Sequence, residues 1–169
     1  MGKRVIAKNI PVIHCKYSEL VPLSQVKPHP DNPNTHTKQD VEEFVELIKY
    51  QGMRRPIDVS NQSGFVTAGH LRLLAFKHAK WSHIPVTYQD YDTPEQEYAD
   101  VIADNAASEW SKLDLALINQ KVPDLGPELD IAMLGIRNFE LEPADKKNKS
   151  SKEPKEVTCP NCGFNFSEE

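Results

Sequence analysis

The segment Phe65-Val66-Thr67-Ala68-Gly69-His70-Leu71-Arg72-Leu73-Leu74-Ala75 says most about the fold of this chain. Its first four residues are typical of a strand, and Gly69 separates them from a stretch that suits a helix. The pattern predicts a strand that turns at Gly69 into a helix of about 70–80. Helix N-termini expose unpaired N–H groups and the positive end of the helix dipole, so this turn is a candidate anion site.

Three residues of the turn carry the chemistry of such a site. Gly69 allows a phosphate to approach the backbone closely, because it has no Cβ. Arg72 projects from the first helical turn, where its guanidinium suits a bidentate contact with a phosphate. His70 offers a further hydrogen bond to the same anion. The alternative is a plain connection from strand to helix, with Arg72 and His70 facing solvent.

Elements of both kinds alternate on either side of this turn. Residues 56–59 and 65–68 are joined by a turn-rich loop and predict a hairpin. Thr37 is a suitable N-cap for a helix of about 38–50, and Gly52 follows that helix as a C-cap. The remaining predicted elements are strands at 17–21 and 84–88, a helix at 94–107 and short helices at 113–121 and 129–134. Because the hairpin makes the sheet at least partly antiparallel, the predicted fold class is α+β.

Two predictions concern the surroundings of these elements. Residues 27–37 contain three prolines and two asparagines, which predict a loop and exclude a helix or a central strand. His29 and His36 of this loop are expected to be solvated rather than to bind a metal. On the helix of 94–107, we expect one side to carry Tyr98, Val101, Ile102 and Asn105.

Two further segments contain candidate binding residues. Arg55 and its neighbour Arg54 precede the rigid Pro56 and suit an anion or a nucleotide, although they equally suit an exposed strand start. Asp104 and Asn105 provide the hard oxygen ligands that Mg²⁺ prefers, although they equally suit a solvated helix surface.

Together these segments resemble the ParB/sulfiredoxin superfamily, whose domain is often labelled ParB-like nuclease. The resemblance extends over residues 17–136. It is nearest to the branch found in phages and at the front of DNA-modification methyltransferases, where Gly-His-x-Arg replaces the Gly-Glu-Arg-Arg turn of chromosome partitioning. The matching segments are HPDNPNTHT at 29–37, Ile48-x-x-x-Gly52, Arg55-Pro56-Ile57, Ala68-Gly69-His70-x-Arg72-x-x-Ala75, Ile84-Pro85-Val86 and Ala103-Asp104-Asn105.

The resemblance implies a mixed sheet with surrounding helices and a nucleotide, CTP or ATP with Mg²⁺, bound at the strand-to-helix turn. His70 and Leu71 replace an acidic residue and an arginine of the partitioning turn, and Arg55 replaces a glutamine, so altered triphosphate and metal contacts are expected. No cysteine lies between Cys15 and Cys159, which argues against sulfiredoxin chemistry. The implied roles are phosphate contact for Gly69, His70 and Arg72, nucleotide flanking for Arg55 and Pro56, the pocket border for Asn32 and Asn34, and the Mg²⁺ site for Asp104 and Asn105.

The C-terminal part differs in composition from the predicted domain, which covers residues 10–140. Residues 142–156 are rich in lysine and predict a flexible linker. The tail, residues 157–169, contains Cys159 and Cys162 at a spacing that suits half of a Zn²⁺ site. The other two ligands would come from a second copy of the chain, giving a homodimer, or from a partner protein. The alternatives are an exposed redox pair and a truncated zinc knuckle.

The composition of the whole chain limits its function. Its 169 residues carry a net charge of −5, which disfavours tight sequence-independent DNA binding. No membrane-spanning run and no secretory signal are recognised, so a cytoplasmic location is expected, in the host cytoplasm if a phage encodes the protein. The favoured hypothesis is a ParB-like nucleotide-binding module in DNA transactions, encoded by a phage or mobile element. The alternatives are a metal-dependent DNA nuclease and a non-enzymatic adaptor to DNA or a DNA methyltransferase, and NTPase activity stays open.

Overall fold

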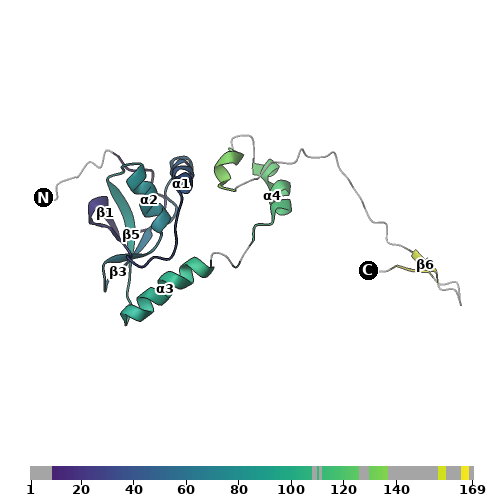
Figure 1. Ribbon diagram of the computed structural model, residues 1–169. Helices are drawn as coiled ribbons and strands as arrows, with labels where there is room; N and C mark the ends of the chain where they lie inside the picture. Colours follow the sequence, from purple (N-terminus) through teal and green to yellow (C-terminus); the bar gives the residue numbers. More distant parts are fainter. Residues whose placement is uncertain are drawn as a thin grey trace. The chain divides into compact units, whose positions relative to one another are not determined.

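The computed structural model (Figure 1) describes residues 9–107, 110, 112–125, 130–136, 156–158 and 165–167. The chain divides into two compact units, Met1–Phe139 and Glu140–Glu169. In the second unit, β6 (Glu156–Thr158) pairs antiparallel with β7 (Asn165–Ser167). Cys159 and Cys162 of the predicted zinc site lie outside the described residues, as does the predicted linker up to Glu156.

The first unit contains a five-stranded mixed sheet in the order β1-β5-β3-β4-β2. The pairs β1–β5 and β3–β4 are antiparallel, whereas β3–β5 and β2–β4 are parallel. The predicted hairpin is therefore confirmed, and so is the α+β fold class with its mixed sheet. The strands are β1 (Glu19–Pro22), β2 (Lys27–Pro28), β3 (Ile57–Ser60), β4 (Phe65–Ala68) and β5 (His83–Gln89).

The described residues of the first unit also contain four α-helices (Figure 1). The first begins as predicted: Thr37 Oγ1 accepts the Asp40 N–H, and the Asp40 carboxylate accepts the Thr37 N–H at 2.7 Å. This reciprocal capping fixes the end of the proline-rich segment of residues 27–37, here called the proline loop. The helices are α1 (Lys38–Gln51), α2 (His70–His78), α3 (Pro94–Ala107) and α4 (Leu115–Lys121), with 3₁₀ turns η1 (Leu23–Gln25), η2 (Val122–Leu125) and η3 (Ile131–Leu134).

The hydrophobic core joins α1 and α2 to the sheet. Alternate residues of each central strand point into it, as the two-residue period of a strand requires. Phe76 of α2 is fully buried and meets Trp81 edge to face, with ring centroids 4.7 Å apart. The core residues include Val45, Ile48, Met53, Ile57, Val59, Val66, Leu73, Phe76, Ile84 and Val86.

Helix α3 contacts β4, and the side expected to carry Tyr98, Val101, Ile102 and Asn105 is only partly buried. Its buried residues are Glu97 and Val101, whereas Tyr98 and Ile102 are exposed. Of the four residues on that side, Val101 is buried and Asn105 is half-buried. The other sheet face instead presents polar side chains such as Ser60, which is buried and pairs with Glu97.

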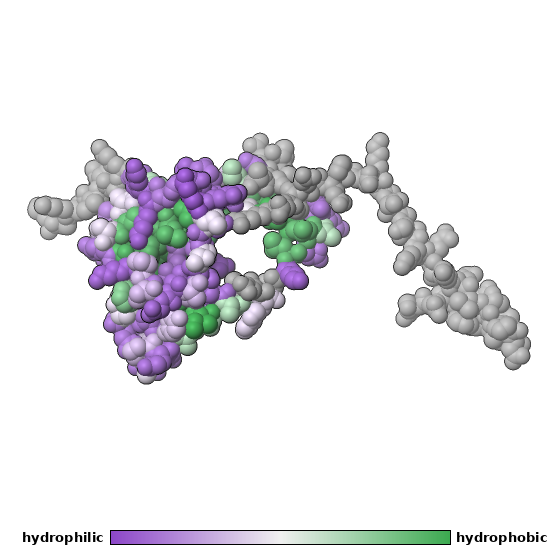
Figure 2. Space-filling view, in the orientation of Figure 1, coloured by the Kyte–Doolittle hydropathy of each residue, from purple (hydrophilic) through white to green (hydrophobic). Residues whose placement is uncertain are grey.

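Two smaller features concern the edge of the sheet and helix α4. Lys27–Pro28, predicted as loop, forms the two-residue edge strand β2. Helix α4 keeps Leu115 and Leu117 exposed, and apolar surface is visible over it in Figure 2. Among the described residues, no helix combines the length and apolar character needed to cross a bilayer.

Candidate functional site

Gly69 begins α2 in a left-handed conformation, with φ 94° and ψ 32°. No side chain caps the helix at this position. A Cβ on Gly69 would come within 2.8 Å of Arg72 Nη1 and within 2.9 Å of Ile57 Cγ2. The absence of a side chain is therefore required by the backbone conformation and by the close packing of β3 and Arg72.

The guanidinium of Arg72 is half-buried beside this turn. Its Nη1 donates a hydrogen bond to the Pro56 carbonyl oxygen at 3.4 Å, which holds the side chain near the start of β3. Burial lowers the pKa of Arg72, as does the neighbouring Arg55, while Asp58 and Asp104 act in the opposite direction. Arg72 remains a cation at neutral pH, because its ordinary pKa lies so far above that range.

Arg72 also lines a cavity of about 170 Å³ between α1 and the segment that leads to β3. Three arginines, Arg54, Arg55 and Arg72, are among its lining residues. Arg54 is anchored by its Nε, which donates to the Gln51 carbonyl oxygen at 2.9 Å. The other lining residues are Phe44, Leu47, Ile48, Gln51, Gly52 and Met53.

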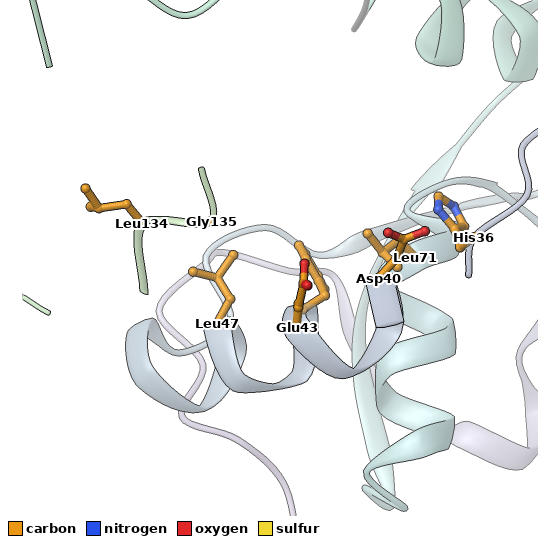
Figure 3. A pocket seen from close by; sticks show the side chains of 8 residues that line it. His36, Asp40, Glu43, Leu47, Leu71, Leu134 and Gly135 are labelled. Carbon is orange, nitrogen blue, oxygen red and sulfur yellow. The ribbon is translucent and has the colours of Figure 1, made fainter. Parts of the chain in front are cut away.

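A second cavity, of about 440 Å³, shares Phe44 and Leu47 with the first (Figure 3). Asp40, Glu43 and Leu47 of α1 line it, with Leu71 and His36 towards one end and Leu134 and Gly135 towards the other. This cavity is lined by two acidic residues, whereas the first is lined by three arginines. The two neighbouring spaces therefore differ in charge, and only the first suits an anion.

His70 lies at the turn, but its ring is engaged with the protein. It is 8% exposed, and its Nε2 accepts a hydrogen bond from the His29 backbone N–H at 3.3 Å. The proton of the neutral ring is therefore on Nδ1. Burial, together with His29 and His36, lowers the pKa of His70 to about 4. His70 is thus uncharged at neutral pH.

The structure brings Asn32, Asn34 and Asn105 together, although 71 positions separate Asn34 from Asn105. Asn34 Nδ2 donates to Asn105 Oδ1 at 2.6 Å, and Asn105 Nδ2 donates to the Val101 carbonyl oxygen at 2.8 Å. A longer contact of 3.4 Å joins Asn105 Nδ2 to Asn32 Oδ1. These amides attach the proline loop to α3. Asp104 is exposed, and its negative charge raises the pKa of Arg72.

Sequence reasoning missed a polar cluster around Glu97. The buried carboxylate accepts hydrogen bonds from Ser60 Oγ at 2.6 Å and Ser63 Oγ at 2.5 Å, and His29 Nε2 lies 3.8 Å away. His29 also stacks on Tyr98, with ring centroids 5.7 Å apart. The prediction that His29 is solvated is therefore wrong. No local pattern marks Glu97 as part of a cluster, because its serine partners lie more than 30 residues away in the sequence.

The described residues contain no group of three His, Cys, Asp or Glu side chains arranged to hold a metal ion. Asp104 and Asn105 are adjacent on α3, but the Asn105 oxygen already accepts a hydrogen bond from Asn34.

Comparison with known proteins now places this geometry in a family. The chain matches the family described as ParB N-terminal domain over residues 10–105. The chain belongs to the ParB N-terminal domain family. It is also 33% identical over 76 residues to the ParB-like nuclease domain-containing protein YnaK of Escherichia coli K12, covering 45% of this chain and 86% of that protein.

The ParB fold is also found among solved structures. The C-terminally truncated chromosome-partitioning protein ParB of Caulobacter crescentus, complexed with CTP-γ-S, has a TM-score of 0.52 and 22% identity. That similarity covers 63% of this chain and 63% of the Caulobacter chain, so this chain spans less than two thirds of it. Sulfiredoxin of Arabidopsis thaliana has a TM-score of 0.41 at 20% identity, covering 49% of this chain and 94% of that one. The ParB N-terminal domain match contains Gly69, Arg72, Arg55 and Asn105.

Proposed function

We propose that this ParB-family chain binds a nucleoside triphosphate, CTP or ATP, with the phosphates at the turn that begins α2. One observation carries the proposal: Arg72 is held over the left-handed Gly69, so a guanidinium and the start of a helix lie at one place. Phosphate binding at helix N-termini relies on backbone N–H groups and on the helix dipole. A CTP-γ-S-bound ParB with the same fold supports this choice of ligand.

The charge around the turn favours the phosphate end of a nucleotide. Arg55 and Arg72 line the same cavity, and Pro56 keeps Arg72 in place through its carbonyl oxygen. Bidentate contacts between guanidinium and phosphate are stronger than neutral hydrogen bonds. The proposed roles are therefore phosphate contact for Gly69 and Arg72, and a flanking position for Arg55 and Pro56.

One residue on α3, Asp104, could provide a ligand for a Mg²⁺ ion that arrives with the nucleotide. Mg²⁺ takes one or two carboxylates together with phosphate oxygens, and it would balance the charge of the triphosphate. Asp104 supplies an exposed carboxylate. Asn105 holds the proline loop by its amide, so we assign it, with Asn32 and Asn34, to the pocket border.

We infer that DNA is the wider setting of this activity, since the chain belongs to the ParB N-terminal domain family. The net charge of −5 means that a DNA contact depends on a local basic surface or on a partner. A Zn²⁺ ion bound by Cys159 and Cys162 would link this chain to a second copy or to a partner protein. Native mass spectrometry with and without a chelator tests that part of the proposal.

The direct test is a thermal-shift screen with CTP, ATP, GTP and UTP in the presence of Mg²⁺. A ligand that binds only the native state raises the melting temperature. We expect CTP or ATP to raise it for the wild type and for Lys77→Ala, an exposed position of the same helix. Arg72→Ala should abolish the shift while its ligand-free melting temperature stays close to that of the wild type. Absence of any shift in the wild type, or an equal shift in Arg72→Ala, contradicts the proposal.

A nuclease is the second candidate, because the relative YnaK is described as a ParB-like nuclease domain protein. Asp104 is an exposed carboxylate, close enough to Arg72 to raise its pKa, that such chemistry would use. Plasmid nicking with Mg²⁺ or Mn²⁺, compared between the wild type and Asp104→Asn, decides this point. An inactive wild type removes the candidate.

A further inference from the structure

His70 connects the start of α2 to the proline loop. Its Nε2 accepts the His29 N–H at 3.3 Å, and the two residues are 41 positions apart in the chain. His70 is the first residue of α2 and directly follows Gly69. A direct hydrogen bond therefore joins the start of the proposed phosphate turn to the backbone of His29.

The loop that receives this contact is fixed at two further points. The ring of His29 is held from both ends, because Nδ1 accepts the Asp31 N–H at 3.1 Å and Nε2 faces Glu97 at 3.8 Å. Farther along, Asn34 Nδ2 donates to Asn105 on α3 at 2.6 Å. The loop from His29 to Asn34 thus spans the distance between the α2 turn and the Asp104–Asn105 segment.

We infer that His70 is a positioning residue: it holds the His29–Asn34 loop against the phosphate turn, and nucleotide affinity depends on that attachment. The inference rests on the proposed nucleotide site. It assigns His70 a role through the loop, in place of the direct phosphate contact that the sequence suggested.

The geometry favours this role over a direct contact. The side chain is buried, and the nitrogen farthest from the backbone is already an acceptor for the loop. An uncharged imidazole adds little to the attraction that Arg72 and Arg55 exert on a phosphate. The contribution of His70 to the site is therefore the hydrogen bond that holds the His29–Asn34 loop.

A pair of variants separates the acceptor from the shape of the side chain. Gln at position 70 places Oε1 where Nε2 lies, whereas Met has a similar length but cannot replace the acceptor. We expect His70→Met to raise the Kd for CTP or ATP about tenfold, the scale of one hydrogen bond, and His70→Gln to stay within about twofold of the wild type. Equal Kd values for His70→Met and His70→Gln would overturn the inference.

A double-mutant cycle with Asn34→Ala tests whether His70 acts through the loop. Because both residues hold one loop, the His70→Met/Asn34→Ala double variant should bind no more weakly than the weaker single variant. Fold-losses that multiply would show that His70 acts independently of the loop, and would also overturn the inference.

Amide exchange of the ligand-free protein separates this inference from the proposed function. The His29 amide should exchange at least about tenfold faster in His70→Met than in the wild type or His70→Gln, because it loses its acceptor. Unchanged exchange refutes the link whether or not the protein binds nucleotide. If His70→Met exchanges faster but the wild-type protein binds no nucleotide, the hydrogen bond from His70 to the loop is real. His70 then has no role in binding, and the inference falls together with the proposed function.

Discussion

Arg72 Nη1 occupies the space that a side chain on Gly69 would need, 2.8 Å from the position of its Cβ. The position of the guanidinium therefore depends on the absence of a side chain at residue 69. The glycine leaves room for the arginine, and Pro56 fixes the arginine in that room. This relationship leads to a direct prediction about stability.

Gly69→Ala should lower the free energy of unfolding by about 2–3 kcal/mol, because it adds a strained backbone conformation and a clash with Ile57 and Arg72. Gly64→Ala is the matched control, since Gly64 also has a positive φ, of 75°, but has no atom within 4 Å of the added Cβ. It should cost only about 1 kcal/mol. Urea denaturation measures both, and equal losses would show that the contacts at Gly69 do not matter.

Glu97→Gln should destabilise the protein by about 1–3 kcal/mol, because two serine hydroxyls donate to the buried carboxylate. Glu95, two residues earlier in the first turn of α3, is exposed, and Glu95→Gln serves as the control. Thermal unfolding compares the two. A Glu97→Gln protein as stable as Glu95→Gln would mean that the Ser60–Ser63 contacts contribute nothing to stability.

The lowered pKa of His70 gives a definite pH dependence. The unfolded chain takes up a proton near pH 6.5, whereas the folded protein does so only near 4, so protons favour the unfolded state between these values. Stability from this residue is complete above pH 6.5 and falls by up to about 3 kcal/mol as the pH drops to 4. His70→Gln should show a shallower loss over the same interval in urea titrations. Parallel curves for the two proteins would contradict the assignment.

Tyr91 should ionise well above the ordinary pKa of a tyrosine side chain. Burial, with the hydrogen bond that its hydroxyl donates to Asp100 at 2.6 Å, raises its pKa to about 12. The unfolded chain loses this proton near pH 10, so stability should fall as the pH rises from 10 to 12. Ultraviolet absorbance titration of the wild type and Tyr91→Phe measures the ionisation. Loss of an early-ionising tyrosine in Tyr91→Phe would refute the assignment.

Local signals in the sequence predicted much of the fold. The capping residue Thr37 and the apolar period of Val41, Val45 and Ile48 identified α1, because cap and period act within one helix. The turn at Gly69 was equally readable, since strand character ends and helix character begins at one glycine. The hairpin then required an α+β fold.

Longer-range features could not be predicted in the same way. The two-residue strand β2 has no period to detect, and its pairing with β4 depends on the tertiary fold. Glu97 has the usual sequence signature of an exposed first-turn acid, yet the sheet face that α3 covers is polar and buries it. His70 was recognisable as part of the site, but its acceptor role depends on a backbone N–H 41 residues away.

Both outer strands of the five-stranded sheet end in proline: β1 ends at Pro22 and β2 at Pro28. Proline has no N–H to donate to an incoming strand, and short edge strands offer little to pair with. These prolines therefore disfavour edge-to-edge strand pairing of this sheet with other copies, which is a route to aggregation. Both edges of the five-stranded sheet are therefore poor sites for pairing with a strand of another copy.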